Sequence, residues 1–519
     1  MNATPKRLLW VDDEIEFLRA HLLFLEEHGY EVETATNGDD GLVMLRQKPF
    51  DLVLLDEQMP GKDGLSTLEE IRASDNNIPV VMVTKSEEER LMEAALGRNI
   101  SGYLIKPVNP SQILSVCKAI LHSRTIRSSH VTSSYVREYA ELKSGLLATP
   151  TPAKWEKIFF QLCKWDFELQ ALPDAGLRET HQANRRELGK KFLTYVEENY
   201  VEWVGRKGGN PDLHTQTLRR KVFPILKRGD KCALVVMAGF RLDQWLALQK
   251  SLDSFFRVEN GMAWSLLPSE NIFCRAALFS GRLPREVSLD QPELWRRLQE
   301  DEDKSPCERE MLRFNLRKGD LENVDPKVVH LRTNEDGGRL LAELDRSDEN
   351  PFLALMVEFP EMLQAQRLAD GGILRELAPD EKAVRDLTAS WFRSSKLYEI
   401  LQWFAAHGRT VVLTSDHGTV RVDAPAEIFC QDEKTPHPRL KTGLNISCDE
   451  RHALFVEAPA QYGLPGESGQ LAYAIAKDNH YFVYPNKFQY FVTQFREQMV
   501  SGGLSMEEML VPLATLIPK

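Results

Sequence analysis

The first 123 residues of the chain alternate short apolar runs with amphipathic stretches. The runs "RLLWVDDE", "YEVETAT", "FDLVLLDEQMPG", "IPVVMVTKS" and "GYLIKP" each read as one strand with polar ends. Helical patterns separate them, such as "EEERLMEAALGR" at residues 87–98. Strands that alternate with helices predict an open parallel sheet of the flavodoxin-like kind, whose ligands bind at the carboxyl ends of the strands.

Residues 124–205 show helical periodicity and no strand pattern. Two segments place large apolar side chains on one helical face. The first set is Trp155, Phe159, Leu162, Trp165 and Leu169, and the second is Leu188, Phe192, Val196, Tyr200 and Trp203. The segment "ATPTP" at residues 148–152 breaks one helix from the next and offers Thr151 as a cap. We therefore expect a three-helix bundle that links two larger domains.

Strands and helices alternate again from residue 206 to residue 519. Strands are expected in "KCALVVMAG", "MAWSLLP", "KVVHLRT", "FLALMVEF", "RTVVLTSDHG", "RHALFVEA" and "HYFVYP". One long amphipathic helix is expected over residues 386–408, "DLTASWFRSSKLYEILQWFAAHG". The pattern predicts a second α/β domain that is larger than the first.

Composition narrows the class of protein. A chain of 519 residues is too long for one core, and three domains fit its length. The formal net charge of -12 argues against a protein that coats DNA or an anionic membrane, and no apolar run approaches a membrane span. Asp12 and Asp13 interrupt any signal-peptide pattern. Seven scattered cysteines without a CxxC motif favour reduced thiols and a cytoplasmic location.

Charged and hydroxyl side chains gather where the strands of the first domain end. These residues are Asp12, Asp13, Asp56, Thr84 and Lys106. Three crowded carboxylates repel each other unless a hard cation joins them, and Mg²⁺ suits such an oxygen cluster. A phosphoryl group accepted by Asp56 would have its charge balanced by the metal, by the Lys106 ammonium and by the Thr84 hydroxyl.

The motifs "VDDE", "LLDEQMPGKDG", "VTK" and "YLIKP" closely resemble those of response-regulator receiver domains. The resemblance implies that Asp56 accepts phosphate from a sensor histidine kinase. It further implies that Asp13 and Asp56 ligate Mg²⁺, that Asp12 supports the ion through water and that Gln58 supplies a backbone carbonyl. Thr84 and Tyr103 would be the switch pair, and the Lys106–Pro107 peptide would be cis. The alternative to a phosphorylated receiver is an ordinary flavodoxin-like domain whose acids are only solvated loop residues.

Several motifs of the large domain resemble the PglZ domains of the alkaline-phosphatase superfamily. They are "FRLDQW", "RAALFSGRLP", "SWFRSSKLYEIL", "TSDHGTVRV", "YPNKFQYFV" and "SGGLSMEEMLVP". Joined to a receiver and a helical linker, they make the chain similar to the PorX-type response regulators of type IX secretion in Bacteroidetes. For that family the resemblance implies control of secretion-gene expression and a zinc-dependent phosphodiesterase-like effector.

The metal site that the resemblance implies is largely absent from this sequence. Of its positions, Asp416 and His417 of "TSDHG" remain, and Glu361 stands where the family has an aspartate. The other positions carry residues that cannot do the same chemistry. Ala238 replaces the first Asp, Asn271 replaces the threonine nucleophile, and Ala365 and Ser501 replace two histidines, with Ser394 in place of a further histidine.

These replacements bear directly on catalysis. Zinc takes about four ligands, alanine offers none, and asparagine has no alkoxide to attack a phosphoryl group. We therefore expect that "TSDHG" preserves the fold of a site that has lost its partners. We do not expect zinc in the domain, although Asp416, His417 and Glu361 could hold one ion weakly. A motif misaligned by one residue is the alternative, with Ser269 close by as a shifted nucleophile, although no shift restores the missing aspartate and histidines.

Three functions are weighed on this basis. The favoured one is a signalling protein in which phosphorylation of Asp56 controls an inactive PglZ-like domain that binds a protein, or a nucleotide without turnover. The second is a phosphorylation-regulated metal-dependent phosphodiesterase or phosphatase, and the third a DNA-binding transcription regulator. A phosphorylation-dependent homodimer is compatible with each, because many receivers pair through their switch face.

Overall fold

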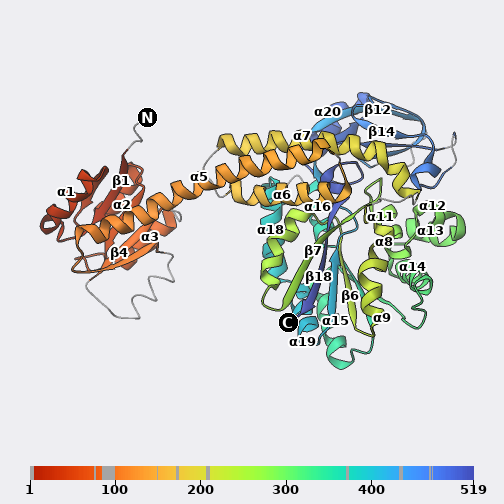
Figure 1. Cartoon of the computed structure of the whole chain (residues 1–519), viewed down its shortest axis with the longest axis horizontal. Helices are drawn as coiled ribbons and strands as arrows, with labels where there is room; N and C mark the ends of the chain where they lie inside the picture. The colour runs from red at the N-terminus through yellow and green to blue at the C-terminus, as the bar shows by residue number, and fades with distance from the viewer. Residues whose placement is uncertain are drawn as a thin grey trace. The chain divides into compact units, whose positions relative to one another are not determined.

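The computed structural model describes residues 5–74, 78–84, 100–148, 150–170, 175–205, 211–369, 373–431, 437–466, 469 and 471–519. The chain divides into two compact units, Met1–Glu138 and Tyr139–Lys519 (Figure 1). The predicted helix at residues 87–98 lies outside the described residues. No helix in the described ranges combines the length and apolar character that crossing a bilayer requires.

The first unit is built on a five-stranded parallel sheet with the order β2-β1-β3-β4-β5. All five strands fall where the apolar runs predict them, and the flavodoxin-like order confirms the expected fold. The strands are β1 (Lys6–Val11), β2 (Tyr30–Ala35), β3 (Leu52–Asp56), β4 (Val80–Thr84) and β5 (Gly102–Ile105). The helices of this unit are η1 (Ile15–Leu18), α1 (Arg19–Glu27), α2 (Gly38–Gln47), α3 (Gly64–Ser74) and the first part of α5 (Pro110–Ala148).

Both faces of this sheet are buried, which explains the continuous apolar runs of its central strands. Alternate residues of β1 enter different cores: Leu9 and Val11 pack on one side, and Leu8 and Trp10 on the other. Because all five strands are parallel, the polar groups that end them lie together at the carboxyl edge of the sheet. Asp12 follows β1 directly, and Asp56 is the last residue of β3.

The linker region is helical, as expected. One continuous helix, α5, joins it to the first unit. Helix α5 runs through residues 123 and 124, where the domain boundary was predicted. Helix α6 (Pro152–Gln170) and helix α7 (Ala175–Val204) follow. The apolar faces predicted for α6 and α7 are buried, and they share one hydrophobic core with the strands of the large sheet. Within the second unit the linker helices therefore pack as part of the α/β domain.

A six-stranded mixed sheet with the order β7-β18-β10-β6-β9-β8 forms the centre of the second unit. Its strands are β6 (Cys232–Met237), β7 (Phe256–Trp264), β8 (Lys327–Leu331), β9 (Phe352–Val357), β10 (Thr410–Thr414) and β18 (Leu510–Pro518). Strands β6, β8, β9 and β10 are parallel, and β18 runs antiparallel to β10 and β7. Figure 1 shows α18 on one side of the sheet and α11 and α14 on the other.

Helices and helical turns connect these strands. They are α8 (His214–Thr217), the π-helical turn η2 (Leu218–Val222), α9 (Phe223–Lys227), α10 (Leu242–Leu248), η3 (Gln249–Leu252), α11 (Asn271–Ser280), α12 (Pro284–Asp290), α13 (Pro292–Glu300), α14 (Ser305–Lys318), α15 (Asn334–Arg346), α16 (Phe359–Ala369), α17 (Ile373–Leu377), α18 (Glu381–Ser394), α19 (Lys396–Ala406), η4 (Pro459–Tyr462), η5 (Pro485–Lys487), α20 (Phe488–Phe495) and α21 (Met506–Met509).

A second, five-stranded sheet has the order β14-β15-β13-β12-β16, and β11 pairs with β17. Its strands and that pair are β11 (Val420–Arg421), β12 (Ala424–Gln431), β13 (Leu440–Cys448), β14 (Ala453–Val456), β15 (Ala472–Ala476), β16 (His480–Val483) and β17 (Met499–Val500). The sequence patterns predicted β14 and β16 but missed β12, β13 and β15.

The single helix predicted over residues 386–408 is wrong. The chain forms α18 and α19, which meet at Ser395, whose backbone is extended. The Ser395 hydroxyl accepts a hydrogen bond from the Tyr398 amide and so caps α19. Serine favours this capping position over a helix interior, and the apolar periodicity alone did not reveal the break.

Candidate functional site

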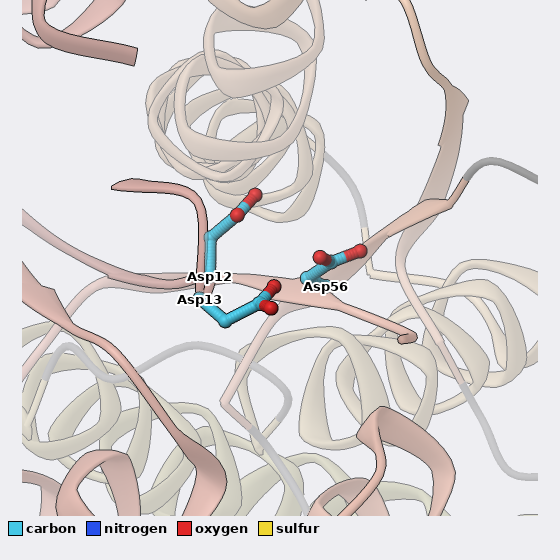
Figure 2. Close-up of side chains that lie close together, drawn as sticks. All are labelled: Asp12, Asp13 and Asp56. Atoms are coloured by element: carbon cyan, nitrogen blue, oxygen red, sulfur yellow. The ribbon is translucent and has the colours of Figure 1, made fainter. Parts of the chain in front are cut away.

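Three carboxylates meet at the carboxyl edge of the first sheet. Asp12 and Asp56 are buried and Asp13 is exposed, and one ligand oxygen from each lies within 4.8 Å of the other two. Figure 2 shows these side chains at adjacent positions after β1 and at the end of β3. The fold therefore brings together the acids that the strand ends predict.

Lys106 is the counter-charge of this cluster. Its Nζ lies 2.9 Å from Asp12 Oδ2 and 2.9 Å from Asp56 Oδ2. Burial raises the pKa of Asp56, and the hydrogen bond from Lys106 opposes that effect. Burial alone would lower the pKa of Lys106, but its two carboxylate partners outweigh this and raise it. The Lys106–Pro107 peptide that positions this side chain is cis, as predicted.

The donor set fits a magnesium ion. Asp56 Oδ1 is buried and has no hydrogen-bond partner of normal geometry among the described residues. A surface pocket beside it is lined by Asp13, Glu57 and Gln58. Since Mg²⁺ takes oxygen ligands and keeps several waters, Asp13 and Asp56 would hold it directly in this open pocket. Gln58 lines the same pocket, and the contribution of its backbone carbonyl to the ion stays a prediction.

The predicted switch pair lies on neighbouring strands. Thr84 ends β4 and is fully buried, and Tyr103 on the adjacent strand β5 is within hydrogen-bonding reach of the Thr84 hydroxyl. Burial raises the pKa of Tyr103, in keeping with an inward-facing ring. The Thr84 hydroxyl also donates a short hydrogen bond to Glu57, a residue that the sequence patterns did not single out.

The second cluster lies in the large domain, at the end of β10. Asp416 and His417 are buried in the loop that follows this strand. Gly418 is required there because a side chain at this position would have its Cβ 1.9 Å from the Glu507 backbone oxygen. Gly418 N also donates to Glu508 O at 2.9 Å. The "TSDHG" loop is thus fixed against the segment that contains α21.

An arginine side chain bridges the two acids of this cluster. Arg275 Nε lies 2.7 Å from Asp416 Oδ2, and Arg275 Nη2 lies 2.9 Å from Glu361 Oε2. Asp416 Oδ1 accepts hydrogen bonds from the amides of Gly239 at 3.0 Å and His417 at 2.9 Å. Burial would raise the pKa of Asp416, but these neighbours hold it well below its usual value. Asp416 is therefore a paired carboxylate with both oxygens engaged.

Asn271 closes the same network from the first turn of α11. Its Nδ2 donates a short hydrogen bond to Glu361, and its Oδ1 is hydrogen-bonded to His417 Nε2. The other ring nitrogen of His417 lies 2.9 Å from Gly418 O. Both ring nitrogens of His417 therefore have oxygen partners within the chain.

The other family positions are placed as follows. Ala238 is buried beside the cluster, and its amide bonds to Val357 O. Ala365 is exposed on α16, whereas its neighbour Gln364 is buried and donates to Gly239 O at 3.2 Å. Ser501 is partly buried on the segment that precedes α21.

The two serines weighed alongside these positions stand apart from the network. Ser269 is fully buried and donates to Gly503 O at 2.8 Å, so its hydroxyl already has a partner. Ser394 is exposed and bonds within its own helix.

Three residues that the sequence patterns did not single out complete this cluster: Arg275, Gln364 and His214. His214 Nε2 lies 2.5 Å from the Asp416 carbonyl, and burial lowers the pKa of His214 to about 4. Arg275 stood inside the quoted motif "RAALFSGRLP", but its partner Asp416 lies 141 positions away. Periodicity does not reveal such a pairing.

The sequence matches three families in order along the chain. Residues 8–118 match the response regulator receiver domain, and residues 125–204 match the PorX response regulator linker domain. Residues 217–516, more than half of the chain, match the BREX system PglZ alkaline phosphatase-like domain. The order of receiver, PorX-type linker and PglZ domain confirms the predicted architecture.

Individual relatives resemble the N-terminal part. ResD of Bacillus subtilis, a transcriptional regulatory protein, is 32% identical over 167 residues, which are 30% of this chain and 69% of ResD. A CpxR homolog of Haemophilus influenzae is 38% identical over 129 residues, 24% of this chain and 55% of that protein. A CheY-like receiver structure from Methanospirillum hungatei is 32% identical, with 23% of this chain and 95% of that chain covered and a TM-score of 0.22. The chain belongs to the PglZ family and is a two-component response regulator of the PorX-like architecture.

Proposed function

We propose that phosphorylation of Asp56 controls a PglZ domain that binds a protein partner and performs no hydrolysis. The observation that carries this proposal is the position of Arg275 between Asp416 and Glu361. A guanidinium is a permanent cation with directional donors, so it satisfies two carboxylates as a metal ion would. It cannot polarise a phosphoryl oxygen as a Lewis acid or lower the pKa of a bound water.

The attacking group is also missing. Asn271 occupies the first turn of α11, and both atoms of its amide are used in hydrogen bonds to Glu361 and His417. An amide forms no covalent phosphoryl intermediate of the threonine type. Ala238 offers no donor atom where a carboxylate would complete the first ion site. The residues of such a site act as a unit, so these losses together leave little activity.

Charge at the cluster favours a protein partner over a nucleotide. Asp416 and Glu361 contribute two negative charges against the single positive charge of Arg275. Glu270 is buried beside them, and burial raises its pKa. A phosphate would meet the carboxylates of Asp416 and Glu361 there without metal ions to offset their charge. A pocket that retained nucleotide binding would need the opposite balance.

The input side of the proposal is the receiver. A receiver domain implies a sensor kinase as partner, and receiver domains use Mg²⁺ for phosphorylation. We propose that Asp56 is the phosphoacceptor, that Thr84, Tyr103 and Lys106 transmit its state, and that the phosphorylated chain forms a homodimer. The seven free cysteines support a reducing, cytoplasmic location. The PorX linker match supports a role in type IX secretion.

One observation favours the second candidate, a phosphodiesterase with displaced ligands. His437 packs against Gly502, beside the position of the lost histidine at 501: a Cβ added at Gly502 would lie 2.5 Å from the ring. Burial lowers the pKa of His437 to about 3, so it is a neutral imidazole. However, Arg439 N donates to its Nδ1 at 3.2 Å. A regulator of transcription, as the names of the relatives suggest, is the third candidate.

A hydrolysis assay separates the first two candidates. The full chain, with and without beryllofluoride and Mg²⁺ to mimic phosphorylation, is incubated with bis-p-nitrophenyl phosphate and with short oligonucleotides, in added zinc or manganese. The proposal predicts the same background rate for the unmodified protein and for a variant with Asp416→Ala and His417→Ala. Turnover above that variant would establish the phosphodiesterase. A steep salt dependence of binding to duplex DNA would favour the third candidate.

A further inference from the structure

We propose that helix α7 of the linker is the element that transmits the receiver signal to the PglZ site, because it holds two segments that support that site. The first segment, residues 265–271, carries Asn271, and the second, residues 501–509, carries Ser501 and supports Gly418. The inference rests on the proposed function only for the origin of the signal in Asp56.

The first contact is an ion pair between α7 and the second segment. Arg185 Nε and Nη2 lie 3.0 Å and 2.8 Å from Glu507 Oε1. Both side chains are more than four-fifths buried. A second carboxylate, Asp166 of α6, lies 2.5 Å from Arg185 Nη1, and the ring of Phe159 lies beneath the guanidinium. Because Arg185 is held on three sides, a shift of α7 would move Glu507 with it.

The second contact joins α7 to the first segment. The Leu267 amide donates to the hydroxyl of Tyr200 at 2.8 Å, and the Tyr200 side chain is fully buried. Leu267 lies four residues before Asn271, and Tyr200 lies fifteen residues after Arg185 on the same helix. One helix therefore contacts both segments through side chains about four turns apart.

The two segments are also bonded to each other. Gly502 N donates to Ser269 O, and the Ser269 hydroxyl donates to Gly503 O, both at 2.8 Å. The second segment is fixed further by Glu508, which pairs with Arg439, and neither side chain is exposed. These bonds join residues 265–271 and 501–509 into one support for the "TSDHG" loop, which we call the floor of the site. The loop contacts this floor through the hydrogen bond from Gly418 N to Glu508 O.

A third contact reinforces the same floor. Glu197 of α7 lies 2.5 Å from Lys477 in the turn between β15 and β16. That turn is bonded to the second segment, since Asp478 N donates to Leu504 O and Leu504 N donates to Ala476 O, each at 2.9 Å. All three contacts of α7 thus lead to the floor of the site.

The input to α7 comes from α5, the helix that begins in the first unit. Within the second unit, Lys143 near the end of α5 lies 3.0 Å from Glu187 of α7. Tyr139 and Leu142 of α5 pack against the shared hydrophobic core. A rotation or shift of the last turns of α5 would therefore be passed to α7 and through it to the floor of the PglZ site.

Hydrogen–deuterium exchange of the full chain tests this role. Arg185→Gln breaks the first contact and Tyr200→Phe the second, and each removes little volume. Arg186→Gln is the matched control, because Arg186 is exposed on the same helix and its Nε donates back to Gln182 O at 3.3 Å. Peptides covering residues 265–271 and 501–509 are followed with and without beryllofluoride and Mg²⁺.

We expect Arg185→Gln to speed exchange in both segments, by about tenfold, although it touches only the second. Tyr200→Phe should likewise speed exchange in the second segment, and Arg186→Gln should affect neither segment. In the unmodified protein, beryllofluoride should change both segments together, and the change should vanish in Arg185→Gln. Effects confined to the segment touched, or a beryllofluoride response that survives in Arg185→Gln, would overturn the proposal.

The readouts separate this inference from the proposed function. Receiver peptides that fail to respond to beryllofluoride in the unmodified protein would contradict control by phosphorylation. The cross-effects of Arg185→Gln and Tyr200→Phe without beryllofluoride would still decide the role of α7. A receiver that responds while both PglZ segments stay unchanged would overturn the role of α7 and leave the receiver chemistry standing.

Discussion

Arg275 Nε donates to Asp416 Oδ2 at 2.7 Å, and Arg275 Nη2 donates to Glu361 Oε2 at 2.9 Å. Arg275 and Asp416 are 141 positions apart in the sequence. The guanidinium thereby neutralises the buried carboxylate of Asp416. A buried carboxylate without a partner is costly, so this pairing stabilises Asp416 within the fold.

Removal of Arg275 should destabilise the large domain strongly. Arg275→Ala leaves Asp416 buried without its cation, which costs on the order of 3 to 5 kcal/mol in unfolding free energy. Arg275→Lys keeps the charge and should cost less. Urea denaturation followed by tryptophan fluorescence measures both. Arg296→Ala, which removes an exposed arginine paired with Glu293 and Glu300, is the control and should have a much smaller effect. Equal losses for Arg275→Ala and Arg296→Ala would contradict the account.

Partial restoration of the family residues should not create an enzyme. A variant with Ala238→Asp and Asn271→Thr regains one ligand and a hydroxyl, but Arg275 still bridges Asp416 and Glu361. We expect no hydrolysis of bis-p-nitrophenyl phosphate above the unmodified protein, because the second ion still lacks its imidazoles.

Only a variant that also carries Glu361→Asp, Ala365→His and Ser501→His has a chance of hydrolysis, because it restores three further family positions. Activity in the two-residue variant would show that the remaining site is more complete than its contacts indicate.

Asp56→Asn should abolish labelling by radioactive acetyl phosphate in the presence of Mg²⁺, because an amide cannot form the acyl phosphate. Asp13→Asn should raise the Mg²⁺ concentration needed for labelling, since it removes one oxygen ligand. Asp39→Asn changes an exposed acid outside the cluster and serves as the control. Labelling that persists in Asp56→Asn would place the acceptor elsewhere.

Lys106→Ala should permit some labelling of Asp56 while uncoupling it from assembly. In the unmodified protein the Lys106 ammonium contacts both Asp12 and Asp56. Without it, no cation from this position can move in response to the charge of a phosphoryl group on Asp56. Size-exclusion chromatography with and without beryllofluoride measures the uncoupling. A beryllofluoride-dependent dimer of unchanged stability in Lys106→Ala would contradict this role.

His330 should make the stability of the large domain depend on pH above neutrality. Burial lowers the pKa of His330, but hydrogen bonds to Glu308 and Glu358 outweigh it and raise the pKa to about 9. A raised folded-state pKa means that the stabilisation is fully present below about pH 6.5. It is then lost as the pH rises through about 9, by on the order of 3 kcal/mol.

Thermal unfolding of the unmodified protein and of His330→Asn between pH 6 and pH 10 measures this. The difference in unfolding free energy between the two should shrink across that range. His407→Asn changes an exposed histidine and should show no such trend. A difference that stays constant with pH would mean that His330 is neutral in the folded protein.

The parts of the fold that follow local rules were predictable. Strands β1, β3, β4, β6 and β10 are largely buried, so their apolar runs stand out, and the acids at the ends of β1, β3 and β10 mark the sites. Strand β12 alternates less exposed and exposed residues along its length, and β13 does so only in its second half, so neither forms a long apolar run. A bulge between Phe429 and Gln431 also interrupts their pairing. Strand β18 contains Pro512, which cannot donate to a ladder, yet it pairs with two neighbours.

The candidate site residues also fall into two groups, those that local sequence patterns predicted and those that they did not. The receiver cluster was predictable because its residues follow parallel strands that end at one edge. The pairing of Arg275 with Asp416, and the contacts of Gln364, depend on tertiary packing between segments more than a hundred residues apart. No local pattern encodes such contacts, so sequence reasoning did not identify Arg275 as the partner of Asp416, and the loss of the metal ligands stays a prediction.

The most direct test of the central claim is a zinc titration of the PglZ site. Isothermal titration calorimetry and metal analysis are applied to the full chain carrying Asp13→Asn and Asp56→Asn, which removes binding by the receiver acids. The account predicts no tight zinc binding, and no difference when Asp416→Ala and His417→Ala are added. About two equivalents of zinc, lost on adding those two substitutions, would show an intact metal centre and contradict the account.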